Sequence, residues 1–152
     1  MTPSATHFHN TIRDDFNERL RAFVRKHELR EVTCETDLKL AGDTVPRPDV
    51  AFIRAEWLAG IDFEQSPLPV APDLVIEIVS KNDRADDLLL KVSQYLQAGP
   101  QAVWLMYPNI RLAYRYIPGK LEPEIRSAEA GAKFEEPGLL PGFSLSLAEI
   151  LG

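Results

Sequence analysis

Apolar and polar residues recur along this chain at two different periods, and the difference predicts its secondary structure. Between residues 11 and 27 the apolar positions lie three or four residues apart, at Ile12, Phe16, Leu20, Phe23 and Val24. That spacing places them on one face of a helix, with Asn10 as its N-cap. A second helix is predicted over residues 83–98, because Gly99-Pro100 follows directly and ends it.

The remaining segments are rich in β-branched and apolar residues, which favours strands. We predict strands over residues 31–40, 48–54, 73–79, 103–107 and 111–117, a short strand near 122–126, and an alternating tail over 141–147. The nearly continuous apolar run at 73–79 is typical of a strand buried on both faces. The resulting order, α-β-β-β-α-β-β plus the tail, predicts an α/β fold with a central mixed β-sheet flanked by helices.

Length and composition fit a single domain over residues 1–152. The chain is 45% hydrophobic, enough for one sizeable core, and shows no internal repeat or linker. No apolar run is long enough to span a membrane, and the N-terminal region lacks an apolar signal-peptide core. We therefore expect a cytoplasmic protein without membrane association. Its single cysteine, Cys34, excludes an internal disulfide.

The net charge of −6 limits the classes of function. Proteins that coat nucleic acid usually carry a basic surface, so this charge counts against such a role. It is compatible with an enzyme that binds divalent cations through carboxylates, because the bound metal reverses the local charge.

Three acids stand in apolar surroundings, which is costly unless each finds a partner. Asp49 begins one predicted strand, Asp73 begins another, and Glu77 lies inside the second. Two converging carboxylates repel each other unless a cation joins them, and oxygen-rich sites suit magnesium or manganese. Alternatively, Asp49 and Asp73 cap turns that follow prolines, and Glu77 forms a structural ion pair. The pattern alone leaves both interpretations open.

Lys91 is the basic candidate. Asp87, Lys91 and Tyr95 recur every four residues and line one face of the second predicted helix. Lys91 could form a solvated pair with Asp87. It could instead lie beside a metal-bound water and offset the charge that develops on a phosphate.

Several motifs together resemble one known family. The motifs are Arg47-Pro48-Asp49-Val50-Ala51-Phe52, the run 72–80, the strand 103–108, and the ending Leu140-Pro141-Gly142-Phe143 with 145–147. Between the second and third of these, the helix spacing of Arg84, Asp87, Lys91, Tyr95 and Gly99 also matches. They occur in the order and at the separations of the Uma-two family, whose members are described as restriction endonucleases of the PD-(D/E)XK superfamily. The resemblance covers about residues 9–151 and implies a restriction-endonuclease-like core.

The resemblance also implies roles for individual residues. Asp49 and Glu77 would bind the metal together with the backbone carbonyl of Ile78. Val79 occupies the position of the superfamily lysine, so the resemblance offers Lys91 as its replacement, with Lys81 as the alternative. The resemblance adds two auxiliary residues. Asp73 begins the strand of the motif at 72–80. His9 matches a family histidine, and the alternative is that its role is purely structural.

By this resemblance the protein is a Mg²⁺-dependent endonuclease, with Mn²⁺ as a substitute ion, that hydrolyses phosphodiester bonds in DNA. Cutting both strands would favour a two-fold homodimer. The alternative is a catalytically inactive nuclease-fold domain that binds nucleic acid or serves as an accessory. Val79 and the acidic charge favour this alternative. In a third reading the acids are incidental and the domain serves assembly alone.

Overall fold

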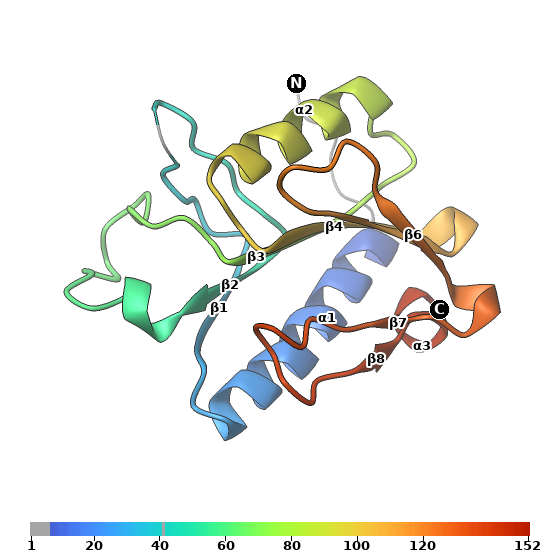
Figure 1. The fold of residues 1–152 in the computed structure, drawn as a ribbon, viewed down its shortest axis with the longest axis horizontal. Helices are drawn as coiled ribbons and strands as arrows, with labels where there is room; N and C mark the ends of the chain where they lie inside the picture. The colour runs from blue at the N-terminus through green and yellow to red at the C-terminus, as the bar shows by residue number, and fades with distance from the viewer. Residues whose placement is uncertain (1–6, 41) are drawn as a thin grey trace.

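Six strands lie side by side in chain order and form a mixed sheet (Figure 1). The computed structural model describes residues 7–40 and 42–152. The strands are β1 (Arg30–Cys34), β2 (Val50–Arg54), β3 (Leu74–Ile78), β4 (Ala102–Tyr107), β5 (Leu112–Tyr116) and β6 (Glu124–Ser127). β3 and β4 pair in parallel, and the other neighbours are antiparallel. This arrangement confirms the α/β fold with a mixed sheet that the sequence predicted.

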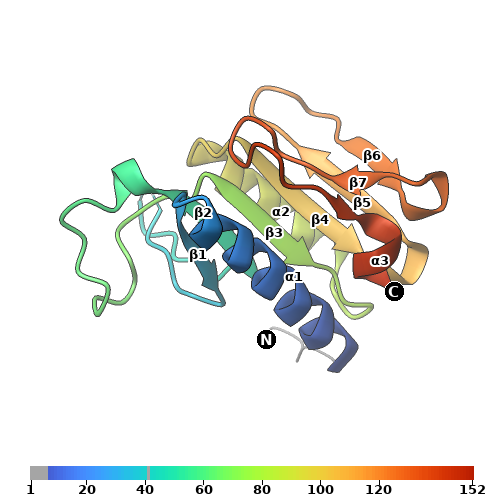
Figure 2. The same ribbon diagram turned by 90° about the horizontal axis from the view of Figure 1, so that it is seen from below.

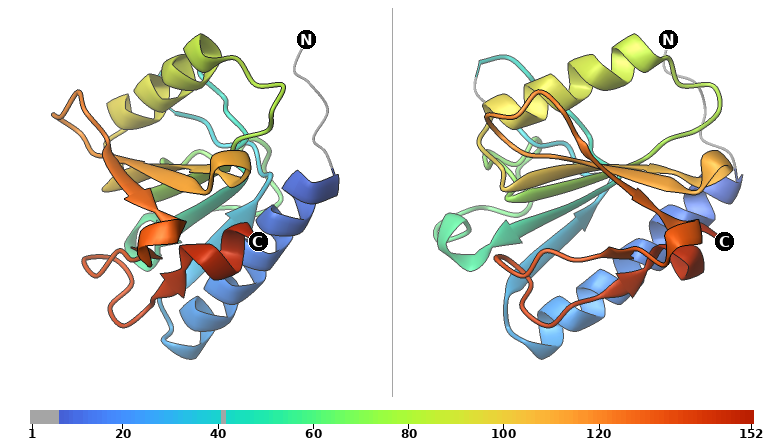
Figure 3. Two further views of the ribbon diagram at one scale, coloured as in Figure 1. Left: turned by 90° about the vertical axis from the view of Figure 1, so that its right-hand side faces the viewer. Right: turned by 45° about the vertical axis from the view of Figure 1, so that its right-hand side comes forward.

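Helices cover both faces of the sheet, which gives three layers (Figures 2 and 3). α1 (His7–Lys26) lies on one face together with the C-terminal elements β7 (Lys133–Phe134), β8 (Leu145–Ser146) and α3 (Leu147–Leu151). α2 (Ala85–Gln97) covers the other face. Short 3₁₀ turns occupy Ala55–Trp57, Pro108–Ile110 and Ala128–Ala130. No helix of the described residues is both long and apolar enough to span a membrane.

α2 forms the crossover between the two parallel strands, β3 and β4. Parallel neighbours need a long connection, and a helix that packs on the sheet supplies it. α2 buries Leu88, Val92 and Tyr95, which lie at positions i, i+4 and i+7 of one face. Tyr95 is therefore a core residue, only 1% exposed, whereas Asp87 of the same predicted row is exposed.

Two predicted boundaries are wrong for identifiable reasons. α1 already includes His7, so Asn10 lies inside the helix instead of capping it. The first strand ends at Cys34 and does not reach residue 40, because Glu35 adopts a left-handed backbone with φ of 48°. The Glu35 amide donates to the carbonyls of Pro48 and Asp49. The chain thus turns away from the sheet beside the start of β2.

Candidate active site

Asp49 and Glu77 face each other across neighbouring strands. β2 and β3 are antiparallel with Val50 opposite Ile76, so the next pair outward is Asp49 and Glu77. Side chains alternate along a strand, and these two share the α2 side of the sheet with Ala51 and Val75. Asp49 is 8% exposed and Glu77 is 5% exposed. The prediction that these two buried acids approach one another is confirmed, while their chemical role belongs to the proposal below.

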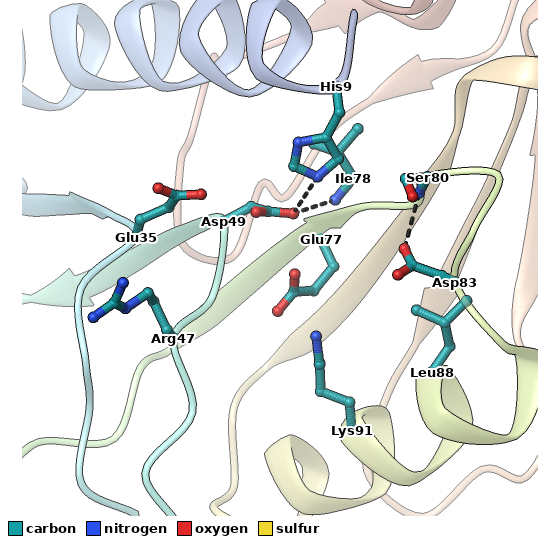
Figure 4. A pocket seen from close by; sticks show the side chains of 10 residues that line it. All are labelled: His9, Glu35, Arg47, Asp49, Glu77, Ile78, Ser80, Asp83, Leu88 and Lys91. Carbon is teal, nitrogen blue, oxygen red and sulfur yellow. Dashed lines mark hydrogen bonds and ion pairs between the residues drawn. The ribbon is translucent and has the colours of Figure 1, made fainter. Parts of the chain in front are cut away.

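Each carboxylate is held by a different layer of the fold. Oδ2 of Asp49 accepts a hydrogen bond from the backbone amide of Ile78 at 2.8 Å and lies 3.3 Å from Nε2 of His9, which comes from α1 (Figure 4). Oε1 of Glu77 accepts from the hydroxyl of Tyr95, on α2, at 2.7 Å. The pair therefore sits at the end of the sheet where both helical layers can reach it.

The two acids have opposite pKa shifts. Burial raises the pKa of Glu77 to about 8, and the nearby charge of Asp49 adds to the effect, although Lys91 and Tyr95 counteract it. Burial also pushes the pKa of Asp49 upward, but hydrogen bonds from His9 and from the Ile78 amide outweigh burial and lower it. In the metal-free protein at neutral pH, Asp49 is therefore ionised and Glu77 retains a proton.

A cleft of about 490 Å³ opens over the two acids. It is lined by His9, Glu35, Arg47, Asp49, Glu77, Ile78, Ser80, Asp83, Leu88 and Lys91. Lys91 extends from α2 toward the Glu77 carboxylate (Figure 4). Lys81 is exposed and lines two smaller neighbouring pockets of about 220 and 230 Å³ instead. The structure thus places Lys91, and not Lys81, beside the paired acids.

Asp73 lies at the opposite end of β3 from Glu77 and does not line the cleft. Its Oδ2 accepts from the backbone amide of Arg54 at 2.8 Å, and its Oδ1 accepts from Nε1 of Trp57 at 3.0 Å. The Arg54 guanidinium also donates to Oδ1, at 3.0 Å. These bonds fasten the turn after β2, so the role of Asp73 is structural, although the turn that it holds is not the one after Pro72 that the sequence suggested.

Among the charged residues that line the cleft, sequence reasoning did not identify Glu35, Arg47 or Asp83. Glu35 pairs with Arg13 at 2.6 Å, and Arg47 pairs with Asp37 at 2.8 Å. Glu35 and Arg47 lie in the irregular segment between β1 and β2, where no periodicity indicates the direction of a side chain. The one sequence signal was that Arg47 stands two residues before Asp49, which could have suggested that it lines the same cleft.

The donor set suits a hard divalent cation. Within residues 7–40 and 42–152, no three His, Cys, Asp or Glu side chains form a cluster ready to hold a metal. Two carboxylates and a backbone carbonyl are nevertheless the oxygen ligands that Mg²⁺ and Mn²⁺ prefer. Burial raises the pKa of Glu77 most, and the negative charge of Asp49 adds to the rise, which a cation bound between the two acids would offset. The residues present therefore fit such an ion.

Comparisons with known proteins identify the family and support the fold. The model of the Uma2 (Uma-two) family, described as "Putative restriction endonuclease", matches residues 1–148. A crystal structure described as a "putative nuclease belonging to DUF820", from Anabaena variabilis ATCC 29413, superimposes with a TM-score of 0.86 at 20% identity, covering 99% of this chain and 84% of that one. It supports the fold. No curated protein matches the chain. By the family match, this chain belongs to the Uma2 family.

Proposed function

We propose that this protein is a metal-dependent endonuclease that hydrolyses phosphodiester bonds in DNA. The observation that carries the proposal is the meeting of Asp49 and Glu77 across β2 and β3, inside a cleft that also receives Lys91. Membership in a family described as restriction endonucleases supports a nuclease. The fold that it shares with the Anabaena protein described as a "putative nuclease" supports it further.

The carboxylates of Asp49 and Glu77, with the backbone carbonyl of Ile78, would hold Mg²⁺, and Mn²⁺ could take its place. Once bound, the ion would polarise a phosphate oxygen and lower the pKa of an attacking water. Glu77 must lose its proton to serve as a ligand, because the raised pKa keeps it neutral in the metal-free protein.

Two residues of α2 would assist from the same side of the cleft. Tyr95 donates to Oε1 of Glu77 and so fixes the direction of that carboxylate. The ammonium of Lys91 points into the cleft beside Glu77, where it would stabilise the negative charge that develops on the phosphate (Figure 4). In this role Lys91 replaces the superfamily lysine, whose position holds Val79.

The proposal also covers the oligomeric state of the protein and the compartment in which it acts. Duplex DNA presents two antiparallel strands, so cleavage of both is supplied most simply by a two-fold homodimer. We propose that such a dimer acts on DNA in the cytoplasm.

A plasmid-nicking assay with Mg²⁺ tests the proposal. The native protein should convert supercoiled plasmid to open-circular and linear forms, whereas Asp49→Asn and Glu77→Gln should not. The matched control is Asp73→Asn, an equally buried acid outside the cleft, which should still nick DNA where it folds. If the native protein binds DNA and metal but never nicks the plasmid, the endonuclease proposal is wrong. The alternative, a catalytically inactive domain that binds nucleic acid, then replaces it.

A further inference from the structure

His9 reaches the paired acids from the layer opposite to Tyr95 and Lys91. It is 8% exposed, lies near the start of α1, and lines the same cleft as Asp49 and Glu77. Its Nε2 is 3.3 Å from Oδ2 of Asp49 (Figure 4). A nitrogen donor therefore stands next to the oxygen donors of the proposed cation site.

The other ring nitrogen of His9 has an acceptor that could hold its proton when Nε2 binds a cation. Nδ1 lies 3.4 Å from Oδ1 of Asn10, which can only accept a hydrogen bond. In the metal-free protein Nε2 donates to the Asp49 carboxylate, and when a cation takes the place of that proton, Nδ1–H can donate to Asn10 while the Nε2 lone pair binds the ion. Metal-binding histidines are commonly oriented in this way, with the second ring nitrogen donating to an oxygen.

The separation of the two atoms fits two ligands of one ion. Neighbouring ligands of an octahedral cation, each about 2.1 Å from the metal, lie about 3.0 Å apart. Nε2 of His9 and Oδ2 of Asp49 are 3.3 Å apart, close to that value. The backbone of Ile78 also hydrogen-bonds to His9. Two of the three proposed metal-binding residues thus contact this ring.

We propose that His9 is a further ligand of the cation and that its nitrogen gives the site a preference for Mn²⁺ over Mg²⁺. This inference rests on the proposed function, because it concerns the same cation. Mg²⁺ favours oxygen ligands and retains water, whereas imidazole suits first-row transition ions better. The native cofactor would then be Mn²⁺ or a similar transition ion.

Calorimetry with Mn²⁺ and Mg²⁺ measures the preference directly. The native protein should bind Mn²⁺ more tightly. His9→Asn should weaken Mn²⁺ binding by about tenfold to a hundredfold, while Mg²⁺ binding changes by less than about threefold. The matched control is His27→Asn, an exposed histidine just beyond the other end of α1, which should change neither affinity.

Electron spin echo spectroscopy of the Mn²⁺ complex gives a second measurement that does not depend on a variant. The native complex should show modulation from a directly bound nitrogen. If the native protein binds Mn²⁺ without this modulation and His9→Asn binds it equally well, the His9 inference is wrong and the proposed function stands. If the native protein binds neither ion, both are wrong.

Discussion

The hydroxyl of Tyr95 donates to Oε1 of Glu77 at 2.7 Å, and both side chains are almost completely buried. This bond joins α2 to β3 at the point where the strand enters the cleft. Tyr95 also packs in the apolar layer between α2 and the sheet. One residue therefore contributes to the core with its ring and to the candidate site with its hydroxyl.

Tyr95→Phe should lower the free energy of unfolding by about 1–3 kcal/mol, because it leaves a buried carboxyl group without its donor. The hydrogen bond also lowers the pKa of Glu77, so its loss should raise that pKa further. Urea denaturation measures the first effect. Tyr114→Phe is the control, since Tyr114 is only half-buried and stacks on Tyr107. If both variants lose the same free energy of unfolding, the hydrogen bond from Tyr95 to Glu77 does not stabilise the fold as proposed.

Plasmid nicking can rank Lys91 and Lys81 by how much activity is lost when each is replaced by alanine. Lys91→Ala should abolish plasmid nicking and leave metal affinity nearly unchanged, because an ammonium does not bind Mg²⁺. Lys81→Ala should retain most activity, because Lys81 lies outside the cleft. Nicking and calorimetry on the same preparations separate catalysis from metal binding. The reverse ranking would mean that Lys81 replaces the missing superfamily lysine.

The sequence made the two acids stand out, and the resemblance to the Uma-two family implied their pairing. A period of two places Asp49 and Glu77 on definite faces, and antiparallel pairing then sets them opposite each other. Apolar surroundings also made Glu77 conspicuous, since a charge inside such a strand requires a partner. The apolar surroundings of Glu77 are a local signal, whereas the register that sets the two acids opposite each other is a property of the assembled sheet.

Contacts between layers were not predictable in the same way. The burial of Tyr95 depends on how α2 is rotated on the sheet, and no sequence spacing fixes that angle. Glu136 shows the same limit, because it lies in a polar, Pro-containing segment and yet is fully buried. It accepts from Nε1 of Trp104 at 2.8 Å and from Nε of Arg115 at 2.6 Å. These partners are more than twenty residues away in the chain.

The same substitution, aspartate to asparagine, should affect metal binding at Asp49 and stability at Asp73. Asp73→Asn should destabilise the protein by about 1–3 kcal/mol, since its carboxylate accepts three hydrogen bonds around β2. It should leave metal affinity within about twofold, because it lies at the far end of β3. Asp49→Asn should instead remove most of the metal affinity. Calorimetry and thermal unfolding of both variants test this contrast, and a metal affinity that depends on Asp73 would contradict it.

The stability of the metal-free protein should fall as the pH rises from about 4.5 to 8. The pKa of Glu77 is about 8 in the folded protein against 4.5 in an unfolded chain. Within this window the folded state retains a proton that the unfolded state has released. The stabilisation is complete below 4.5 and is lost through 8, at up to about 1.4 kcal/mol per pH unit. His9 acts in the same direction only above its ordinary pKa of 6.5, because its pKa is also raised.

Between pH 4.5 and 6.5 the change in the free energy of unfolding therefore comes mainly from Glu77. Asp49 contributes only at lower pH, because its pKa is depressed below 3.8. Urea denaturation across the interval should show a falling free energy of unfolding for the native protein and a nearly flat one for Glu77→Gln. Saturating Mn²⁺ should reverse the native trend, because the ion competes with the proton on Glu77 and binds more tightly as the pH rises. A native protein as flat as Glu77→Gln would mean that Glu77 is already ionised without metal.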